Sequence, residues 1–205
     1  SKLRRIPIKF TSVVKLPTKT IISMTKKIKV PLKQKSADSA EITLGLTDPK
    51  SPSNVGAVMR AAGCYQVDTV LYSGIRYARA AKFHTDTQSA SKKIPLIAVD
   101  SLAESLPEGS KLICVDLIEG AIPLPAFVHP KNAMYVFGPE DGTISQEVID
   151  KADAVVYIPT NGCMNLAATV NVLLYDRLAK LPTAVGNDEL IRKSRDTNNT
   201  VKVKK

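Results

Sequence analysis

The chain of 205 residues contains no tryptophan, and aromatic residues make up only 5% of it. Proteins that hold nucleic acid by base stacking present several aromatic side chains on one surface. We therefore expect aromatic stacking to contribute little to ligand binding. No apolar run approaches the ~18 residues of a membrane-spanning helix, so we expect no membrane partner.

Cysteine and histidine are also scarce. Cys64, Cys114 and Cys163 form no C-x-x-C pair, and His84 and His129 lie far apart in the sequence. This distribution argues against a disulfide framework and against a metal site. It is typical of a reducing compartment, so we expect a cytoplasmic protein that requires no metal.

The formal net charge of +10 is concentrated at the two ends of the chain. Residues 1–40 contain eleven Lys or Arg and one acid, whereas residues 41–191 contain twelve basic and seventeen acidic residues. Residues 192–205 contain six basic residues and one acid. Basic segments bind polyanions, so we expect residues 1–40 to form an arm that binds RNA or DNA. A solubilising segment is the alternative.

The arm also shows a weak strand pattern. Ile28, Val30 and Leu32 alternate with lysines, and Pro31 would confine such a strand to the edge of a sheet. The arm could therefore pack on the domain instead of binding a partner. Its basic, hydroxyl-rich composition resembles an organellar transit peptide, but its prolines interrupt any amphipathic helix.

The central region alternates between apolar runs and helical patterns. Strands are expected at Glu41–Leu46, Val67–Tyr72, Ile94–Val99, Leu112–Leu117, Met134–Phe137 and Ala154–Ile158. Helices are expected from about Asn54 to Gly63 with a Ser53 or Asn54 cap, near Ser101–Leu106, at Gln146–Ala152 after Ser145, and at Asn165–Leu181. Residues 118–130 form a proline-containing loop. This order predicts an α/β domain over residues 41–182, with a mostly parallel sheet and helices on both faces. A polar, mobile tail is expected over residues 183–205.

Two helical segments suggest surfaces for partners. Arg76, Arg79 and Lys82 have helical spacing in the polar segment 76–93, which faces substrate or is an ordinary surface helix. The last helix is apolar around most of its circumference, so we expect it to be buried or to form an interface. The residues expected to form a homodimer interface are Leu166, Val170, Leu173 and Leu174.

Two of the predicted strands end in loops rich in glycine, proline and asparagine. These loops are residues 138–143 and 159–162. In an open α/β sheet, ligands bind in crevices outside the carboxyl ends of the strands. Neither a G-x-G-x-x-G fingerprint nor a P-loop is present, so the common dinucleotide and triphosphate sites are not predicted.

Three stretches resemble the motifs of a known family. They are Asn54-Val-Gly-Ala-Val-Met-Arg60, Phe137-Gly-Pro-Glu-Asp-Gly-Thr-Ile144, and Ile158-Pro with Met164-Asn-Leu-Ala-Ala168. They are similar to the three motifs of the SpoU (TrmH-like) RNA ribose 2′-O-methyltransferases of the SPOUT class. The likeness covers about residues 41–181 and implies a C-terminal deep trefoil knot that holds S-adenosylmethionine. It also implies a homodimer whose active site uses both subunits.

The resemblance predicts methyl transfer from S-adenosylmethionine to a ribose 2′-hydroxyl of structured tRNA or rRNA. A knotted RNA-binding protein or assembly factor without catalysis is the alternative, and a base methyltransferase of the same class is a third possibility. The cofactor contacts it implies are Leu117, Gly138, Ile158, Cys163 and Met164, although Ile158 could be plain strand core. Many relatives have serine where this chain has Cys163.

The resemblance implies that Arg60 is the catalytic arginine. An arginine is a reluctant base because its pKa lies above ~12, so its expected role is to grip phosphate and stabilise the developing alkoxide. The 2′-hydroxyl proton would then pass to phosphate or water. Asn54, Glu140 and Asn165 are expected to hold the loops together and to orient Arg60.

Overall fold

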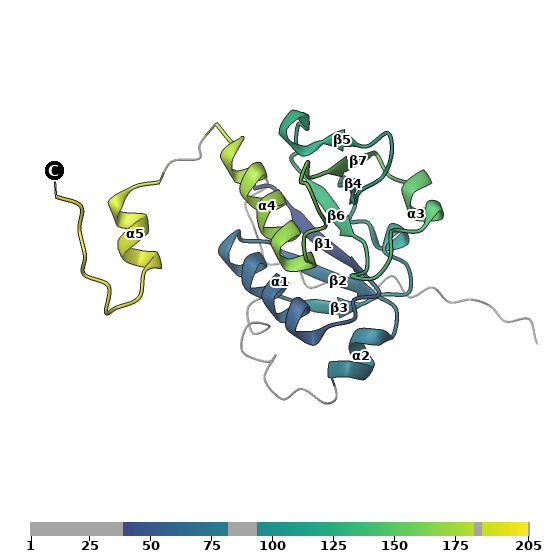
Figure 1. Ribbon diagram of the computed structural model, residues 1–205, viewed down its shortest axis with the longest axis horizontal. Coiled ribbons are helices and arrows are strands. Elements are labelled where there is room, and N and C mark those ends of the chain that lie inside the picture. The colour runs from purple at the N-terminus through teal and green to yellow at the C-terminus, as the bar shows by residue number, and fades with distance from the viewer. Residues whose placement is uncertain (1–38, 82–93, 183–185, 205) are drawn as a thin grey trace, which may run out of the picture. The chain divides into compact units, whose positions relative to one another are not determined.

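The computed structural model describes residues 39–81, 94–182 and 186–204 (Figure 1). The predicted basic arm, except for its last two residues, and most of segment 76–93 lie outside the described residues. A single sheet of parallel strands has the order β3-β2-β1-β6-β4-β7-β5. The strands are β1 (Ile42–Thr47), β2 (Thr69–Ser73), β3 (Leu96–Ala98), β4 (Lys111–Val115), β5 (Ile122–Pro123), β6 (Ala133–Phe137) and β7 (Ala154–Tyr157). The predicted α/β class with a parallel sheet is confirmed, and the trefoil knot stays a prediction.

The central strand β6 shows why the sheet is buried on both faces. Every residue of β6 is buried. Tyr135 and Phe137 belong to one apolar cluster, and Met134 and Val136 belong to the other. Because successive side chains of a strand point to opposite faces, this short apolar run supplies both halves of the core.

Helices cover both faces, as predicted. Helices α1 (Pro52–Cys64) and α4 (Leu166–Ala179) pack together on the face that contains Tyr135 (Figure 1). The opposite face is covered by Leu102 beside the 3₁₀ turn η1 (Ala103–Ser105), by Ile144, and by helix α3 (Gln146–Asp150). Both faces of the sheet are thus covered. Because the strands are parallel, the carboxyl ends of all seven lie at the same edge of the sheet.

The start of α1 differs from the expectation. Pro52 is the first helical residue, and Ser51, not Ser53 or Asn54, caps the helix by accepting a hydrogen bond from the Asn54 N–H at 3.4 Å. Proline is well suited to this position because its fixed φ matches the helix and its missing N–H would have no helical partner. Asn54 is thereby left free to use its side chain elsewhere.

Three further elements were not expected from the sequence. The expected loop 118–130 contains the edge strand β5 and the 3₁₀ turn η2 (Leu124–Ala126). The tail expected to be mobile contains α5 (Asp188–Ser194), which Asn187 caps by accepting from the Leu190 N–H at 2.8 Å.

Ser145 precedes α3 as predicted, but its side chain makes no capping hydrogen bond. Segment 76–93 begins with helix α2 (Arg76–Ala81).

The residues expected to form a dimer interface on α4 belong instead to the core. They are at most 7% exposed and pack in the cluster that includes α1: Leu166, Val170, Leu173 and Leu174. The exposed apolar side chains of α4 are Val172, Tyr175 and Leu178. The prediction failed because a helix with apolar residues on several sides has no single hydrophobic stripe to separate core from surface. In the part of the chain that the structure describes, no helix is long and apolar enough to span a membrane.

Candidate functional site

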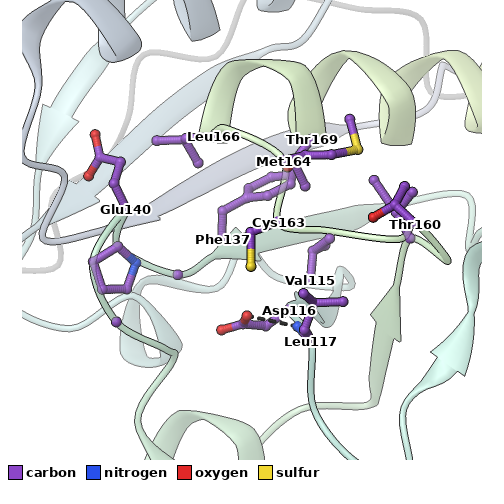
Figure 2. A pocket seen from close by; sticks show the side chains of 14 residues that line it. Val115, Asp116, Leu117, Phe137, Glu140, Thr160, Cys163, Met164, Leu166 and Thr169 are labelled. Atoms are coloured by element: carbon purple, nitrogen blue, oxygen red, sulfur yellow. Dashed lines mark hydrogen bonds between the residues drawn. The ribbon is translucent and has the colours of Figure 1, made fainter.

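A cavity of about 150 Å³ lies at the carboxyl edge of the sheet (Figure 2). Its walls come from the residues that follow β4, β6 and β7 and from the start of α4. All five predicted cofactor contacts line it: Leu117, Gly138, Ile158, Cys163 and Met164. Three segments that are distant in sequence thus meet at one site because parallel strands end at the same edge.

The loop that follows β6 forms one wall of this cavity, and Asp116 holds it in place. Asp116 Oδ2 accepts hydrogen bonds from Thr143 Oγ1 at 2.8 Å and from the Ile144 N–H at 3.0 Å. A Cβ at Gly138 would approach the same oxygen to 2.8 Å, so glycine at the first position after β6 allows the loop to pass close to this carboxylate. No local pattern in the sequence indicated Asp116, because its partners lie 27 and 28 residues away.

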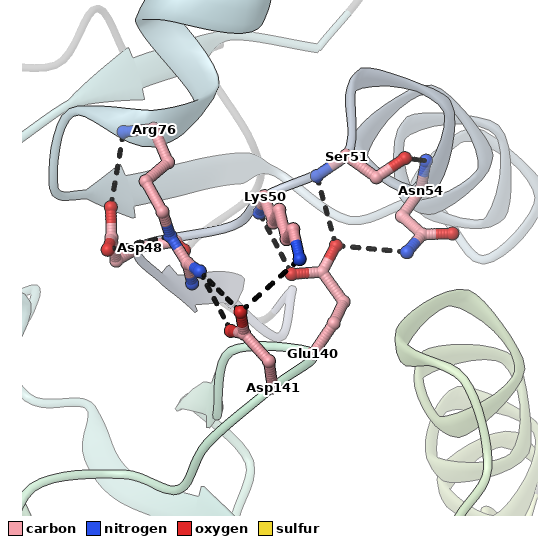
Figure 3. A network of polar contacts seen from close by, with 7 residues as sticks. All are labelled: Asp48, Lys50, Ser51, Asn54, Arg76, Glu140 and Asp141. Carbon is pink, nitrogen blue, oxygen red and sulfur yellow. Dashed lines mark hydrogen bonds and ion pairs between the residues drawn. The ribbon is translucent and has the colours of Figure 1, made fainter.

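Glu140, from the same loop, is bound to the beginning of α1 (Figure 3). Its carboxylate accepts hydrogen bonds from the Asn54 Nδ2 at 2.9 Å and from the N–H groups of Lys50 and Ser51 at 2.8 and 3.2 Å. Burial alone would raise the pKa of Glu140, but these hydrogen bonds outweigh it and lower the pKa. Glu140 therefore remains ionised and joins the cavity wall to the helix that contains Arg60.

The next residue, Asp141, is bound to a different helix. Arg76, at the start of α2, places its Nη1 at 2.8 and 2.9 Å from the two Asp141 oxygens and its Nε at 2.8 Å from Asp48 Oδ2 (Figure 3). The side-chain hydrogen bond from Arg76 lowers the pKa of Asp141. Lys50 Nζ lies 3.5 Å from the same carboxylate. Arg76 thus connects the segments that follow β1, β2 and β6. Its helical spacing in the sequence did not indicate this structural role.

Close backbone packing accompanies this ion cluster. Gly74 has φ +80°, and a Cβ there would lie 2.1 Å from Asp48 Oδ1. Asp48 itself has φ +39°, which few non-glycine residues adopt. The loops after β1 and β2 are therefore pressed together at the edge of the sheet that forms the cavity.

Comparison with known proteins identifies the chain. The model of the SpoU rRNA Methylase family matches residues 41–175, which include the whole sheet and the cavity. The chain belongs to the SpoU rRNA methylase family. The resemblance inferred from the three sequence motifs is confirmed.

Individual relatives agree with this assignment. The chain is 26% identical over 148 residues to the 23S rRNA (guanosine-2′-O-)-methyltransferase RlmB of Nitrosomonas europaea, an alignment that covers 64% of this chain and 57% of that protein. The chain thus spans little more than half the length of this curated relative.

Solved structures share the fold. The SpoU methyltransferase AviRb of Streptomyces viridochromogenes in complex with AdoMet superposes with a TM-score of 0.58 and 19% identity, covering 69% of this chain and 58% of that one. A structure that describes the 2-OH methylation of C/U34 on tRNA gives a TM-score of 0.58 and 24% identity, covering 68% of this chain and 90% of that one.

In this SpoU chain, a hydrogen bond joins two of the four predicted catalytic residues. Asn54 and Glu140 are hydrogen-bonded to each other. Asn165 caps α4, accepting from the Ala168 N–H at 2.7 Å. Arg60 is exposed on α1, and its side chain makes no hydrogen bond or ion pair with the other residues that the structure describes. The Asn54–Glu140 hydrogen bond therefore joins the loop after β6 to the first turn of α1, and among the described residues no side-chain contact orients Arg60.

Hydroxyl groups do line the cavity, although Cys163 replaces the serine of many relatives. Thr160 and Thr169 are both lining residues. Each donates its hydroxyl proton to a backbone carbonyl, that of Gly162 at 2.7 Å and that of Asn165 at 2.9 Å, respectively. Their oxygen lone pairs remain able to accept a hydrogen bond from a ligand. Neither threonine was predicted from the sequence.

Among the described residues, no group of three or more His, Cys, Asp and Glu side chains could hold a metal ion. Cys64 and Cys163 are free and exposed, and Cys114 is free and buried. Burial, together with the nearby Asp116 charge, raises the pKa of the Cys114 thiol to about 12. Cys114 is therefore a neutral core residue.

Proposed function

We propose that this chain transfers a methyl group from S-adenosylmethionine to a ribose 2′-hydroxyl of structured RNA, either tRNA or rRNA. Its membership of the SpoU rRNA methylase family supports this activity. The RlmB relatives are 23S rRNA guanosine-2′-O-methyltransferases, and another neighbour concerns methylation of a tRNA. The RNA substrate class is taken from these proteins. This chain matches 57% and 58% of the length of the two RlmB relatives.

The observation that carries the proposal is the chemistry of the cavity wall. Among the lining residues that the structure describes, Asp116 and Glu140 are acidic, and no lysine, arginine or histidine is present. Such a wall disfavours the phosphates of ATP or NAD and favours a nucleoside that bears positive charge. Leu117, Ile158 and Met164 add apolar surface for an adenosine group. The wall therefore fits S-adenosylmethionine, which supplies an electrophilic methyl group when bound.

Arg60 acts on the RNA side of this site. Its guanidinium, exposed on α1, is free to bind an RNA phosphate and to stabilise negative charge on the ribose oxygen as its proton leaves to phosphate or water. The Glu140–Asn54 hydrogen bond keeps the first turn of α1 in register with the cavity wall. Glu140 and Asn54 are thus positioning residues, and Arg60 is the residue that meets the substrate.

The purified protein is expected to bind S-adenosylmethionine in the presence of a metal chelator, because the cavity wall offers a nucleoside site and the described residues include no metal ligand set. Isothermal titration calorimetry in EDTA measures this. Methyl transfer is then tested with total RNA and isotope-labelled cofactor, followed by mapping of ribose methylation. Cofactor binding without any methylated ribose would favour a non-catalytic RNA-binding role. Failure to bind the cofactor contradicts the proposal as a whole.

We also propose that the protein is a homodimer that pairs through the exposed apolar side chains of α4. Val172 and Leu178 are 37% and 44% exposed, and Tyr175 between them is 62% exposed. These residues recur every three positions and form one strip, which a second copy would remove from water. Sedimentation at micromolar concentration is expected to show a dimer. Tyr175→Glu should yield a monomer, whereas Ile191→Glu, on the exposed α5, should leave the dimer intact.

Residues 1–40 are proposed to grip the RNA backbone, because they hold eleven basic residues and one acid. Each neutralised phosphate contributes about 0.7–0.9 to the slope of log affinity against log salt. Deleting residues 1–36 should therefore flatten that slope by several units and leave cofactor binding intact. RNA titrations at three salt concentrations measure the slope. A lower melting temperature with an unchanged slope would show that the arm packs on the domain instead.

A further inference from the structure

Two acidic residues, Asp116 and Glu140, line the cavity. Asp116 is the one whose carboxylate does not bind the beginning of α1. The other lining acid, Glu140, directs both carboxylate oxygens to the beginning of α1. Asp116 lies directly after β4 and is drawn among the cavity side chains in Figure 2. In the part of the chain that the structure describes, no ion pair involves Asp116.

The Asp116 carboxylate is held rigidly by neutral donors. Oδ1 accepts from the Leu117 N–H at 2.8 Å, and Oδ2 accepts from Thr143 Oγ1 and from the Ile144 N–H. Hydrogen bonds from neutral groups fix the orientation of the carboxylate but supply no formal positive charge. A fixed, uncompensated negative charge therefore faces a site whose lining includes apolar Leu117 and Phe137. The charge also reaches the buried thiol of Cys114, whose pKa it helps to raise.

We propose that Asp116 is a specificity-determining residue that makes this site prefer S-adenosylmethionine to its demethylated product, S-adenosylhomocysteine. This inference rests on the proposed function. The two molecules share their adenosine, amino and carboxylate groups, and they differ by one methyl group and by the positive charge on sulfur. A fixed negative charge near the sulfur attracts the sulfonium, and the product has no charge there.

The size of the preference follows from Coulomb's law. For two unit charges about 7 Å apart at an effective dielectric constant of about 40, the attraction corresponds to roughly a sevenfold difference in affinity. Methyl transfer removes the positive charge, so the attraction is present before the reaction and absent after it. Asp116 thereby helps the site to bind the methyl donor and to release the product.

A purely structural role for Asp116 makes a different prediction. Loss of its hydrogen bonds to Thr143 and Ile144 would loosen the cavity wall. A looser wall weakens binding of both molecules, because they share every group except the methyl group and the charge. The ratio of the two dissociation constants therefore separates a charge effect from loop anchoring, whereas either constant alone does not.

The test measures dissociation constants of both molecules by calorimetry for the full chain and two variants. Asp116→Asn removes the charge, and it is expected to lower the ratio of the S-adenosylhomocysteine constant to the S-adenosylmethionine constant by roughly sevenfold. The matched control is Thr143→Val, which removes one of the same hydrogen bonds without changing any charge. It is expected to change the ratio by less than about twofold.

If Asp116→Asn weakens the binding of both molecules equally, the ratio of the two dissociation constants does not change. That result overturns the inference and leaves the proposed function standing. Absence of S-adenosylmethionine binding in the wild-type protein overturns both. A second measurement uses the wild-type protein alone and so does not depend on folding of a variant. Salt screens charges in a solvent-open site, so the preference should shrink as ionic strength rises. A preference independent of salt and of Asp116→Asn would refute a charge-based mechanism.

Discussion

Replacing Arg60 with alanine is expected to lower the rate of methyl transfer by about 10²–10³-fold, the usual cost of removing one preorganised group that stabilises an oxyanion. Affinity for S-adenosylmethionine should not change, because Arg60 does not line the cavity. Arg60 is exposed on α1, and the first turn of that helix is held in place by Glu140 without using Arg60. The substitution should therefore leave the cavity wall intact.

Single-turnover methylation of RNA, paired with calorimetric titration of the cofactor, checks this result. Arg60→Lys should recover only part of the activity, because an ammonium group cannot form the paired hydrogen bonds that a guanidinium makes with phosphate. Cys64→Ala, an exposed position one turn further along α1, serves as the matched control and should remain active. If Arg60→Ala retains more than about a tenth of wild-type turnover, Arg60 is not the group that stabilises the reacting oxygen.

Local patterns were sufficient to locate most strands and the loops of the site. Met134–Phe137 is a short apolar run that ends at a glycine, and such a run is recognisable without any tertiary information. The parallel order of strands then implies that loops 138–143 and 159–162 share one edge. The five cofactor contacts implied by the family resemblance lie in or beside these loops and after β4, and they line a single cavity for this reason.

Interactions between distant residues could not be predicted in this way. Arg76 meets Asp141 across 65 positions, and nothing in the local sequence of either residue indicates the pairing. The edge strand β5 contains only Ile122 and Pro123, which is too short for any periodicity. Helix α5 was missed because its polar segment lacks an apolar stripe, although Asn187 with two acids after it is a recognisable helix start.

Arg177 was likewise not singled out in the sequence, yet its replacement is expected to have a large effect on stability. Its side chain is 4% exposed beneath the C-terminal half of α4. The guanidinium donates to the carbonyl oxygens of Pro130 and Lys131, both at 2.6 Å, and to the hydroxyl of Tyr135 at 2.9 Å. Tyr135 is completely buried.

Further polar contacts join the C-terminal end of α4 to the residues that precede β6. His129 lies between the Tyr135 hydroxyl, at 2.7 Å from its Nδ1, and Asp176, at 2.9 Å from its Nε2. Lys180 donates to the carbonyl oxygens of Leu124 and Phe127 at 2.6 and 3.0 Å. Polar contacts thus bind α4 to residues 124–131, and α4 begins at the cavity.

Arg177→Ala should reduce the free energy of unfolding by about 2–5 kcal/mol, because it leaves buried acceptors without a donor and opens a void beneath α4. Urea denaturation should show a lower midpoint with an unchanged slope. Tyr135→Phe removes only the shared hydroxyl and should cost about 1 kcal/mol. Arg79→Ala, at an exposed position of α2, should change stability by less than about 0.5 kcal/mol. A loss below about 1 kcal/mol for Arg177→Ala would mean that water replaces the guanidinium, and that α4 does not depend on this residue for its position.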